Sequence, residues 1–426
     1  MFRKHDPAVL VTGAGPVGLF TALQLARRSV DLRIVERERS PTSHSYALAL
    51  HPASLALLED AGVDLPRLRD ALRVESIVFS DGPHVRAHAK FTDLPVRHPY
   101  LLVLRQSLLE RILVEELRSY GVSVDWSHRL HSFQPLGDTV KADVEKLDRI
   151  ATGYPIATSE EEVVREYHWH PRFLVGTDGH RSVVRRRLGI GFPAVGAAQL
   201  FGVFEFESTH PVPPEVRVVL HNGTTNVLWP LPDGRVRWSF ELTDEPEIFG
   251  EDLRHKSRLA VQVGPDAFPH LTVDLLNLLL EERAPWFGVC EGDITWSVLA
   301  RFERRLAESF GRGRIWLAGD SGHLTGPAGI HSMNVGLREG AELANRIADV
   351  EAGACGLDTF ANYSNERRDE WRHLLGLEPD LLPAPTADEW IRENAAGIVS
   401  CLPGTGDELR YLAGQLGLAL SEATAA

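Results

Sequence analysis

Short apolar runs alternate with stretches of helical periodicity in the first part of the chain. Residues 8–11 and 32–35 are apolar runs, and residues 17–28 between them place apolar side chains at helical spacing. Strands buried on both faces of a parallel sheet are apolar throughout, so this order predicts such a sheet with helices packed against it. Two later runs, 173–175 and 315–318, predict further strands of the same kind.

A different pattern lies between residues 200 and 241, where strand-like runs are separated by turn sequences. The runs cover residues 201–206, 216–221, 225–229 and 235–241. Asn222-Gly223 and Asp233-Gly234 separate them, and such dipeptides are the strongest short-range hairpin signals. We expect an antiparallel meander. In its last strand Val236, Trp238 and Phe240 share one face because side chains alternate along a strand.

Composition and charge narrow the class of protein. Of the 426 residues, 43% are hydrophobic and 24% are charged, which is typical of a globular protein large enough for two packed domains. The net charge of −14 argues against binding to nucleic acid or to an anionic membrane surface. We interpret the run Arg185-Arg186-Arg187 as a solvated helix face. No apolar segment is long enough to span a membrane, and no signal peptide is visible.

Cysteine usage adds an expectation about the compartment. Cys290, Cys355 and Cys401 lie far apart and lack the spacing of metal ligands. This indicates a reducing environment and thiols that are buried or idle. We therefore expect a cytoplasmic protein without a metal site.

The first glycine-rich motif carries chemistry. Gly13-Ala14-Gly15-Pro16-Val17-Gly18 follows the first predicted strand and opens the first predicted helix. Glycines here allow a tight turn, close approach of the backbone to a pyrophosphate, and close helix–strand packing. Glu36 ends the second strand, where an acid accepts hydrogen bonds from a ribose 2′-hydroxyl and repels a 2′-phosphate. The motif, with Glu36 and the adjacent Arg37, predicts a site for the adenosine of FAD or NAD.

Two further motifs stand at the ends of the later strands. Gly176-Thr177-Asp178-Gly179 follows the third apolar run, and Ala318-Gly319-Asp320 ends the fourth. A loop with Pro327 and Gly329 comes next, and a helix is expected from about Ser332 to Asp349. The amino end of that helix would direct its amides at whatever lies over the loop, where they favour negative charge.

Together the three motifs resemble those of the class A flavoprotein monooxygenases, the family typified by p-hydroxybenzoate hydroxylase. The resemblance spans roughly residues 8–370. It implies that the second motif lies near the FAD pyrophosphate, that the aspartate of the third binds the ribityl chain, and that the Pro-x-Gly loop lies at the isoalloxazine ring. The residues that it assigns to the flavin site are Arg105, Asp178, Gly179, Gly319, Asp320, Pro327, Gly329, Ile330, Met333 and Asn334.

The loop departs from the usual family sequence, Pro-x-Gly-Gly-Gln-Gly-Met-Asn. Ile330 and Ser332 replace glycines and His331 replaces glutamine, so side chains stand where backbone normally approaches the ring. His331 could tune the flavin or donate a proton, or its side chain could point away. We take His331 and Pro327 as candidate catalytic residues. Tyr46-Ala47 stands where relatives commonly carry Arg-Ala, an arginine associated with flavin and nicotinamide handling.

One face of the predicted meander would wall an apolar pocket over the flavin, as the resemblance implies. Candidate lining residues are Phe201, His221, Trp229 and Trp238. His221 is also a candidate for deprotonating a phenol. The alternative for each aromatic residue is packing under helices expected at 251–263 and 271–282, and the alternative for His221 is an ordinary strand-surface histidine.

We therefore expect an α/β protein with a Rossmann-type, glutathione reductase-like FAD-binding domain and a substrate domain built on an antiparallel sheet. The FAD-binding domain is expected to be discontinuous, with segments 1–72, 101–190 and 285–375. The substrate domain takes 73–100 and 191–284. A C-terminal tail, 376–426, should hold two short helices, one capped by Thr386 and one from Asp407 to about Gln415.

The resemblance also implies an activity. NAD(P)H reduces FAD, O2 gives a flavin C4a-hydroperoxide, and one oxygen atom passes to an aromatic or polyketide-like small molecule by hydroxylation, epoxidation or oxygen insertion. The expected cofactors are FAD and, transiently, NADPH or NADH; the expected partners are the substrate and O2, and the oligomeric state is left open. The alternatives are a flavin-dependent dehydrogenase or reductase, a halogenase, whose Trp-x-Trp-x-Ile-Pro signature is absent, and a non-catalytic FAD-binding protein.

Overall fold

A six-stranded sheet forms the centre of the part of the chain that carries the three motifs. The computed structural model describes residues 6–41, 49–64, 68, 71–152, 158–243 and 271–421. The strand order is β19-β20-β12-β1-β2-β8, and all neighbours are parallel except the β19–β20 pair. The four apolar runs of the sequence are all strands of this sheet. Its strands are β1 (Val9–Thr12), β2 (Leu32–Glu36), β8 (Val124–Trp126), β12 (Phe173–Gly176), β19 (Gly311–Arg312) and β20 (Ile315–Leu317).

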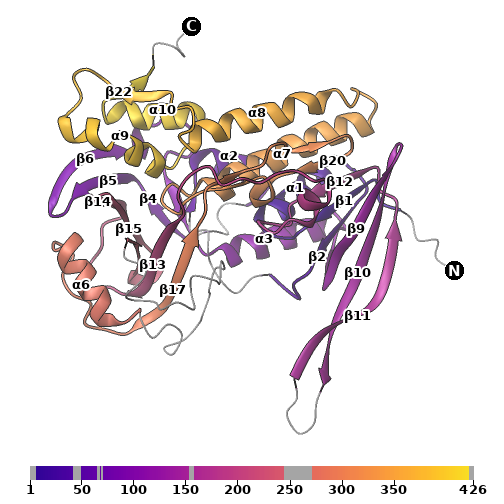
Figure 1. Cartoon of the computed structure of the whole chain (residues 1–426), viewed down its shortest axis with the longest axis horizontal. Coiled ribbons are helices and arrows are strands. Elements are labelled where there is room, and N and C mark those ends of the chain that lie inside the picture. Colours follow the sequence, from indigo (N-terminus) through magenta and orange to yellow (C-terminus); the bar gives the residue numbers. More distant parts are fainter. Residues whose placement is uncertain are drawn as a thin grey trace.

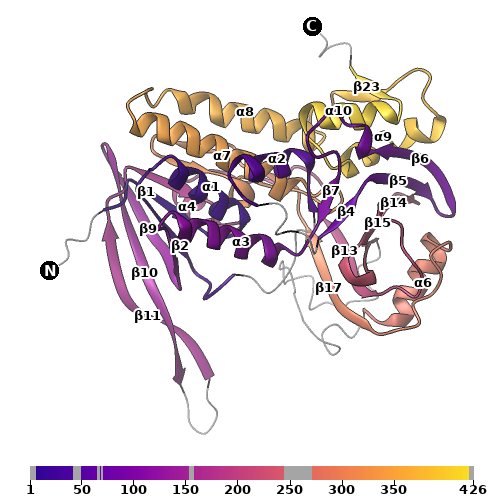
Figure 2. The same ribbon diagram turned by 180° about the vertical axis from the view of Figure 1, so that it is seen from behind.

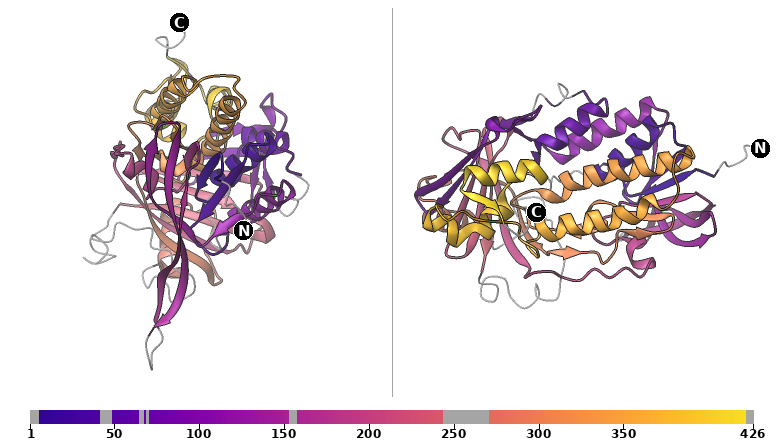
Figure 3. Two further views of the ribbon diagram at one scale, coloured as in Figure 1. Left: turned by 90° about the vertical axis from the view of Figure 1, so that its right-hand side faces the viewer. Right: turned by 90° about the horizontal axis from the view of Figure 1, so that it is seen from above.

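Helices cover one face of this sheet. They are α1 (Pro16–Arg27), α2 (Pro52–Asp60), α3 (Gln106–Ser119), α7 (His331–Glu351) and α8 (Thr359–Leu374). Their apolar stripes form one core with Val9, Val11 and Ile34 of the sheet, and each large side chain buried there contributes roughly 1.5–3 kcal/mol. Ser29, just after the carboxyl end of α1, takes the left-handed φ of 57° that a glycine often supplies. Viewed from above, α7 and α8 run side by side (Figure 3).

A three-stranded antiparallel sheet and the short helix α4 (Val183–Arg187) cover the other face. The sheet consists of β9 (His128–Leu136), β10 (Thr139–Thr152) and β11 (Thr158–Trp169). Its long strands extend away from the body of the molecule at the end opposite the larger antiparallel sheet (Figures 1 and 2). Its base packs on Leu10, Leu174 and Leu317 of the central sheet through Leu130, Val140 and other apolar side chains.

The larger, seven-stranded sheet has the order β17-β13-β16-β15-β14-β5-β6, and all neighbours are antiparallel except β14 and β5. The expected hairpin turns are present, with Asn222 and Asp233 at φ of 48° and 65°. β14, β15 and β16 form the expected meander, but β13 pairs with β16 rather than with β14, which pairs in parallel with β5. The strands are β5 (Ser76–Asp81), β6 (His84–Lys90), β13 (Gln199–Glu207), β14 (Glu215–His221), β15 (Thr224–Pro230), β16 (Arg235–Leu242) and β17 (Ile294–Phe302).

Each face of this sheet is covered by a different part of the chain. α6 (Val273–Arg283) packs against one face, close to the helix expected at 271–282; the helix expected at 251–263 lies outside the described residues. The tail covers part of the other face (Figure 1) with α9 (Glu389–Cys401) and α10 (Gly406–Gln415). α9 is capped by Asp388, which accepts a hydrogen bond from the Trp390 amide, and not by Thr386 as expected.

Short elements complete the described fold. β3 (Ala49–Leu50), β7 (Leu101–Val103) and β4 (Leu72–Val74) form a small sheet between the two large ones, and three-residue 3₁₀ turns lie at Phe91–Asp93, Pro232–Gly234 and Gly319–Ser321. The remaining strand pairs are β18 (Arg305–Leu306) with β21 (His323–Leu324), and β22 (Leu381–Pro383) with β23 (Leu418–Leu420). In the described part of the chain, no helix combines the length and the apolar character needed to cross a membrane.

Candidate functional site

The three motifs meet at the carboxyl ends of three adjacent parallel strands. Thr12 of β1 pairs with Gly176 of β12, which pairs with Leu317 of β20, so each motif begins at the same edge of the sheet. Gly13 lies so close to the second motif that a Cβ added there would be 2.3 Å from the Thr177 carbonyl oxygen. Ligands of open α/β sheets bind outside the carboxyl ends of the strands, so this edge is the candidate site.

Gly15 and Gly18 of the first motif differ in whether the fold itself requires a glycine. A Cβ at Gly18 would lie 1.9 Å from the Gly13 carbonyl oxygen, so helix–strand packing itself requires a glycine there. A Cβ at Gly15 would meet nothing within 4 Å, and its φ of −70° suits any residue. The fold therefore gives no reason for glycine at position 15. Open space above this backbone, at the amino end of α1, suits a close-lying pyrophosphate.

Val17 joins the first motif to the third. Its side chain would contact a Cβ at either Gly319 or Gly336, at 3.1 and 2.6 Å. Pro16, the first residue of α1, is buried beside it. The backbones of α1, α7 and the third motif can approach this closely because these positions lack side chains.

The side chains of Glu36 and Arg37 have different partners in the structure. The Glu36 carboxylate accepts hydrogen bonds from the Ala14 amide at 2.7 Å and the Glu38 amide at 2.9 Å. This fixes it beside the glycine turn, and each carboxylate oxygen keeps a lone pair for a ribose hydroxyl. Arg37 instead extends to Glu161 of β11, at 2.9 Å. Its side chain is thus engaged with the long antiparallel strands.

Asp178 is held by the chain that follows it. Its Oδ2 accepts hydrogen bonds from the amides of Val183 at 2.6 Å and Val184 at 3.2 Å, and Gly179 forms the intervening turn with a φ of 74°. Its other oxygen, Oδ1, is buried without a partner among the described residues. Burial raises the pKa of Asp178. A rigid carboxylate with one oxygen unused is suited to accept a ligand hydrogen bond.

Arg185 corrects the sequence interpretation of the arginine run. It is buried, not solvated. Its guanidinium donates hydrogen bonds to the carbonyl oxygens of Ser321 and His180, each at 2.7 Å, and thereby ties the second motif to the third. Periodicity could not reveal this, because the partner lies on a distant strand end. Arg186 and Arg187 are exposed, as expected.

Asp320 is exposed to solvent but closely surrounded by protein. Its side chain is exposed, yet enough protein surrounds it that desolvation raises its pKa. The nearby histidines His323 and His180 and a hydrogen bond with the Ser332 side chain oppose that shift. The carboxylate is therefore available to a ligand while its loop is fixed from behind.

Glu339 of α7 holds this loop in place, and no motif in the sequence pointed to it. Its carboxylate accepts hydrogen bonds from the Gly319 amide at 2.8 Å and the Trp371 indole at 2.8 Å, and it contacts His323 Nε2 at 3.0 Å. The His323 and Trp371 rings stack with centroids 3.7 Å apart. Although burial alone would raise it, the pKa of Glu339 is lowered by these partners, so the buried carboxylate is ionised and paired.

The loop before α7 has an unusual backbone. Ile330 takes φ 49° and ψ 41°, the left-handed region, which is a rare conformation for a β-branched residue. α7 begins at His331, one residue earlier than expected, and no side chain caps its amino end. The first amides of this 21-residue helix have no partner within the helix, and they lie next to the loop that precedes it.

Met333 and Asn334 point their side chains into the protein. Met333 is buried in the core that also contains α1. The Asn334 amide accepts a hydrogen bond from the His51 backbone at 2.8 Å and donates to the carbonyls of Ala49 at 3.0 Å and Ile330 at 2.8 Å. Any contact of these two residues with a ligand would have to use backbone atoms.

His331 also lies inside the protein. Only 2% of its surface is exposed, and its Nε2 lies 3.0 Å from the Leu402 carbonyl oxygen in the tail. Burial lowers the pKa of His331 to about 4, so the ring is neutral at pH 7. Of the two expectations for His331, this geometry matches the side chain that points away from a ligand.

The expected pocket residues lie on opposite faces of the large sheet. Trp238 packs under α6, stacked on Phe240 with ring centroids 4.9 Å apart, which is the alternative arrangement for an aromatic residue. Phe201 and Trp229 pair with Glu241 and Arg237, so both belong to the other face. Trp229 shares a cluster with Ala328 of the loop, so this second face is the one that meets the flavin segment.

His221 and Arg105 lie on different elements, the β14–β15 hairpin and the amino end of α3. His221 lies at the tip of the β14–β15 hairpin, where its Nδ1 is 3.3 Å from Asp81. That position is the ordinary strand-surface histidine that we weighed as the alternative. Arg105 is exposed at the amino end of α3. Burial and, to a smaller extent, the charge of Arg105 lower the pKa of Arg237, which forms a buried ion pair with Glu205.

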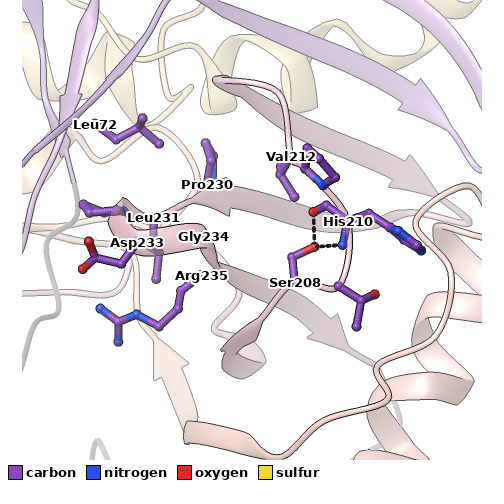
Figure 4. Close-up of a pocket in the computed structure, with 12 residues that line it drawn as sticks. Leu72, Ser208, His210, Val212, Pro230, Leu231, Asp233, Gly234 and Arg235 are labelled. Carbon is purple, nitrogen blue, oxygen red and sulfur yellow. Dashed lines mark hydrogen bonds between the residues drawn. The ribbon is translucent and has the colours of Figure 1, made fainter.

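A separate cavity of about 450 Å³ opens at one end of the strands β13, β15 and β16 of the same sheet. One wall is the segment 208–212 and the other is the turn at 230–235, with Leu72 above (Figure 4). Ser208 is used internally, since it exchanges hydrogen bonds with His210. None of the three motifs lines this cavity, so it is distinct from the candidate cofactor site.

Comparison with known proteins agrees with this geometry. The chain is 30% identical to 6-methylpretetramide 4-monooxygenase of Streptomyces rimosus, over 86% of this chain and 60% of the relative. It is 26% identical to pentachlorophenol 4-monooxygenase of Sphingobium chlorophenolicum, over 88% of this chain and 64% of the relative. The chain thus spans about two thirds or less of the length of these relatives.

Solved structures show the same fold. A p-nitrophenol 4-monooxygenase from Pseudomonas putida superposes with a TM-score of 0.71 at 21% identity, over 96% of this chain and 93% of that one. An aklavinone-11 hydroxylase in complex with FAD and aklavinone gives a TM-score of 0.69 at 24% identity, over 96% and 73%. A family model described as FAD binding domain matches residues 6–375. The chain therefore belongs to this family of FAD binding domains, and FAD is its cofactor.

Proposed function

We propose that the protein is an FAD-dependent monooxygenase that uses NADPH or NADH and O2 to insert one oxygen atom into an aromatic or polyketide-like small molecule. The observation that carries the proposal is the meeting of the flavin loop with an apolar sheet face. Trp229 and Ala328 share one apolar cluster, and a Cβ at Gly326 would lie 3.2 Å from Gln199, at the start of β13. The names of the relatives, a 6-methylpretetramide 4-monooxygenase and a pentachlorophenol 4-monooxygenase, support the same chemistry.

The residues of this chain would bind, orient and exclude water. We assign the pyrophosphate to the backbone around Gly15, the ribose to Glu36 and the ribityl chain to Asp320. When bound, FAD would supply the redox chemistry, because a nicotinamide can reduce it and its reduced form can activate O2. The uncapped amino end of α7 would stabilise negative charge on the reduced ring system. Phe201, Val203 and Val298 form an apolar patch on the facing sheet that would hold an aromatic ring and keep water out.

The nicotinamide requires no second fold in this proposal. The sequence contains one glycine-rich nucleotide motif, and Glu36 after it disfavours a 2′-phosphate at that position. We infer that the reductant visits the flavin site transiently. The Tyr46-Ala47 pair, which bears on this step, lies outside the described residues. A cytoplasmic location remains a prediction from cysteine usage.

A flavin-dependent dehydrogenase is the second candidate, and the Ile330 side chain favours it. Ile330 stands where the family has glycine, so the surface offered to the ring by this loop differs from that of relatives. A changed surface there would alter how the site handles O2 without altering FAD binding.

One experiment separates these functions. The purified protein, loaded with FAD, is screened with phenolic and polycyclic compounds for stimulated oxidation of NADPH and NADH, and products are analysed by mass under ¹⁸O₂. The proposal predicts a product heavier by one ¹⁸O atom. A product oxidised without ¹⁸O would establish the dehydrogenase instead. Absence of any NAD(P)H oxidation with every compound would favour a non-catalytic FAD-binding protein.

A further inference from the structure

The C-terminal tail makes direct contact with the loop that precedes α7. The matched family region ends at residue 375, and the described tail continues to residue 421. A Cβ at Gly329 would lie 2.8 Å from the Ser400 carbonyl oxygen. His331 Nε2 is 3.0 Å from the Leu402 carbonyl oxygen. The segment 400–405, which joins α9 to α10, therefore lies against the flavin loop.

The same loop is held from its other side by His51. The His51 ring nitrogen Nε2 is 3.0 Å from the Gly329 carbonyl oxygen, and the His51 and His331 rings meet edge to face with centroids 5.9 Å apart. A Cβ at Gly329 would come within 2.2 Å of the His331 ring. Gly329 is thus enclosed by two buried histidines and by the tail.

Two further contacts extend this interface along α7. Arg338, two turns after His331, donates a hydrogen bond to the Thr405 hydroxyl at 2.9 Å. Ala328 and Leu402 belong to one apolar cluster, against which Ile330 packs. The left-handed backbone of the β-branched Ile330 is strained, and neighbours that enclose it on several sides are what such a conformation needs to persist.

We propose that the segment 400–405 is a positioning element of the flavin site, and that His331 is the residue through which it sets the loop 327–330. His331 is neutral at pH 7, because burial lowers its pKa to about 4. Its ring therefore carries one N–H, which donates to the tail carbonyl. His331 acts on the flavin through the loop backbone and is not a catalytic residue.

The test is the behaviour of bound flavin in His331→Ala and His331→Gln. His331→Ala removes the donor and the ring, so we expect the Kd for FAD to rise about tenfold or more, with a shifted flavin midpoint potential and an altered visible spectrum. His331→Gln keeps an N–H donor for Leu402, so we expect its Kd to stay within about threefold of wild type. His84→Ala, on exposed β6, is the control and should change none of these readouts.

The outcomes separate positioning from mere stability. A folded His331→Ala protein with wild-type Kd, midpoint potential and spectrum would overturn the proposal. If His331→Ala does not fold, Gly329→Ala decides, because its Cβ would push on both His331 and Ser400 and should disturb the same flavin readouts. The inference rests on the proposed placement of the ring at this loop. All readouts are taken without substrate, so a failure of the monooxygenase assignment leaves them interpretable.

Discussion

The Nη1 of Arg185 donates a 2.7 Å hydrogen bond to the carbonyl oxygen of Ser321, and this bond joins two motifs that the chain separates widely. The guanidinium also stacks on Phe192, 3.8 Å from the ring centroid. Burial lowers the pKa of Arg185 to about 10, which leaves it protonated at neutral pH. A buried cation held by two carbonyl oxygens and a ring fixes the spacing of the second and third motifs.

Replacement of Arg185 by alanine should therefore damage both stability and cofactor retention. The buried carbonyl oxygen of Ser321 and the part-buried carbonyl oxygen of His180 would lose their donor, so we expect a loss of about 2–4 kcal/mol in the free energy of unfolding. The FAD content of the purified protein should fall as the motifs move apart. Denaturant unfolding and the ratio of flavin to protein absorbance measure the two effects. Arg187→Ala, an exposed neighbour, is the matched control; equal behaviour of the two variants would contradict the assigned role.

Two glycines of the first motif should separate folding from ligand binding. Gly15→Val should leave the apoprotein folded, since a Cβ at that position meets nothing within 4 Å, yet abolish FAD binding by occupying the space of the pyrophosphate. Gly18→Val should destabilise the apoprotein itself, because its Cβ would overlap the Gly13 carbonyl. Thermal unfolding of the apoproteins and FAD titration test the pair. A Gly15→Val protein replete with FAD would refute the first-motif assignment.

These contrasts show what the sequence could and could not predict. Strands and turns followed from local patterns, because apolar runs and Asn-Gly or Asp-Gly pairs act over a few residues. The partners of Arg185 and Glu339 depend on strand order, which no local pattern encodes. Alternation correctly grouped Val236, Trp238 and Phe240 on one face but could not say that α6, and not the flavin loop, lies over it. The contact of His331 with Leu402 required knowing where the tail packs.

Asp320 should contribute to FAD retention more than to folding. Desolvation raises its pKa in the protein, so the ionised carboxylate does not stabilise the apoprotein. Asp320→Ala should therefore leave the free energy of unfolding of the apoprotein unchanged or slightly higher. Its Kd for FAD should rise by about tenfold to a hundredfold, as expected for the loss of one or two charge-assisted hydrogen bonds. Isothermal titration with FAD checks this, and normal flavin content in the variant would refute the assignment.

Glu408 of α10 gives the tail a pH-dependent contribution to stability. Burial raises the pKa of Glu408 from its ordinary value near 4.5 to about 7, against the opposing effects of the Arg338 charge and a hydrogen bond from the Ala53 backbone. Its Oε2 is buried without a partner among the described residues. Arg338 also faces Glu342 and Glu370, so it is not dedicated to Glu408.

The sign of the effect follows from proton binding. Between pH 4.5 and 7 the folded protein holds a proton on Glu408 that the unfolded chain has released, so this group makes stability fall as pH rises through that window. Glu408→Gln stays neutral throughout. We expect it to raise the free energy of unfolding at pH 8 by up to about 3 kcal/mol, at roughly 1.4 kcal/mol per pKa unit, and to give no such gain below pH 4.5. Urea unfolding at pH 4.5, 6 and 8 measures the difference. Asp407→Asn, at a fully exposed neighbouring side chain, should show no comparable pH-dependent gain. Parallel curves for Glu408→Gln and wild type across this range would show that Glu408 is ionised in the folded protein, and that the α10 interface with α7 carries no buried proton.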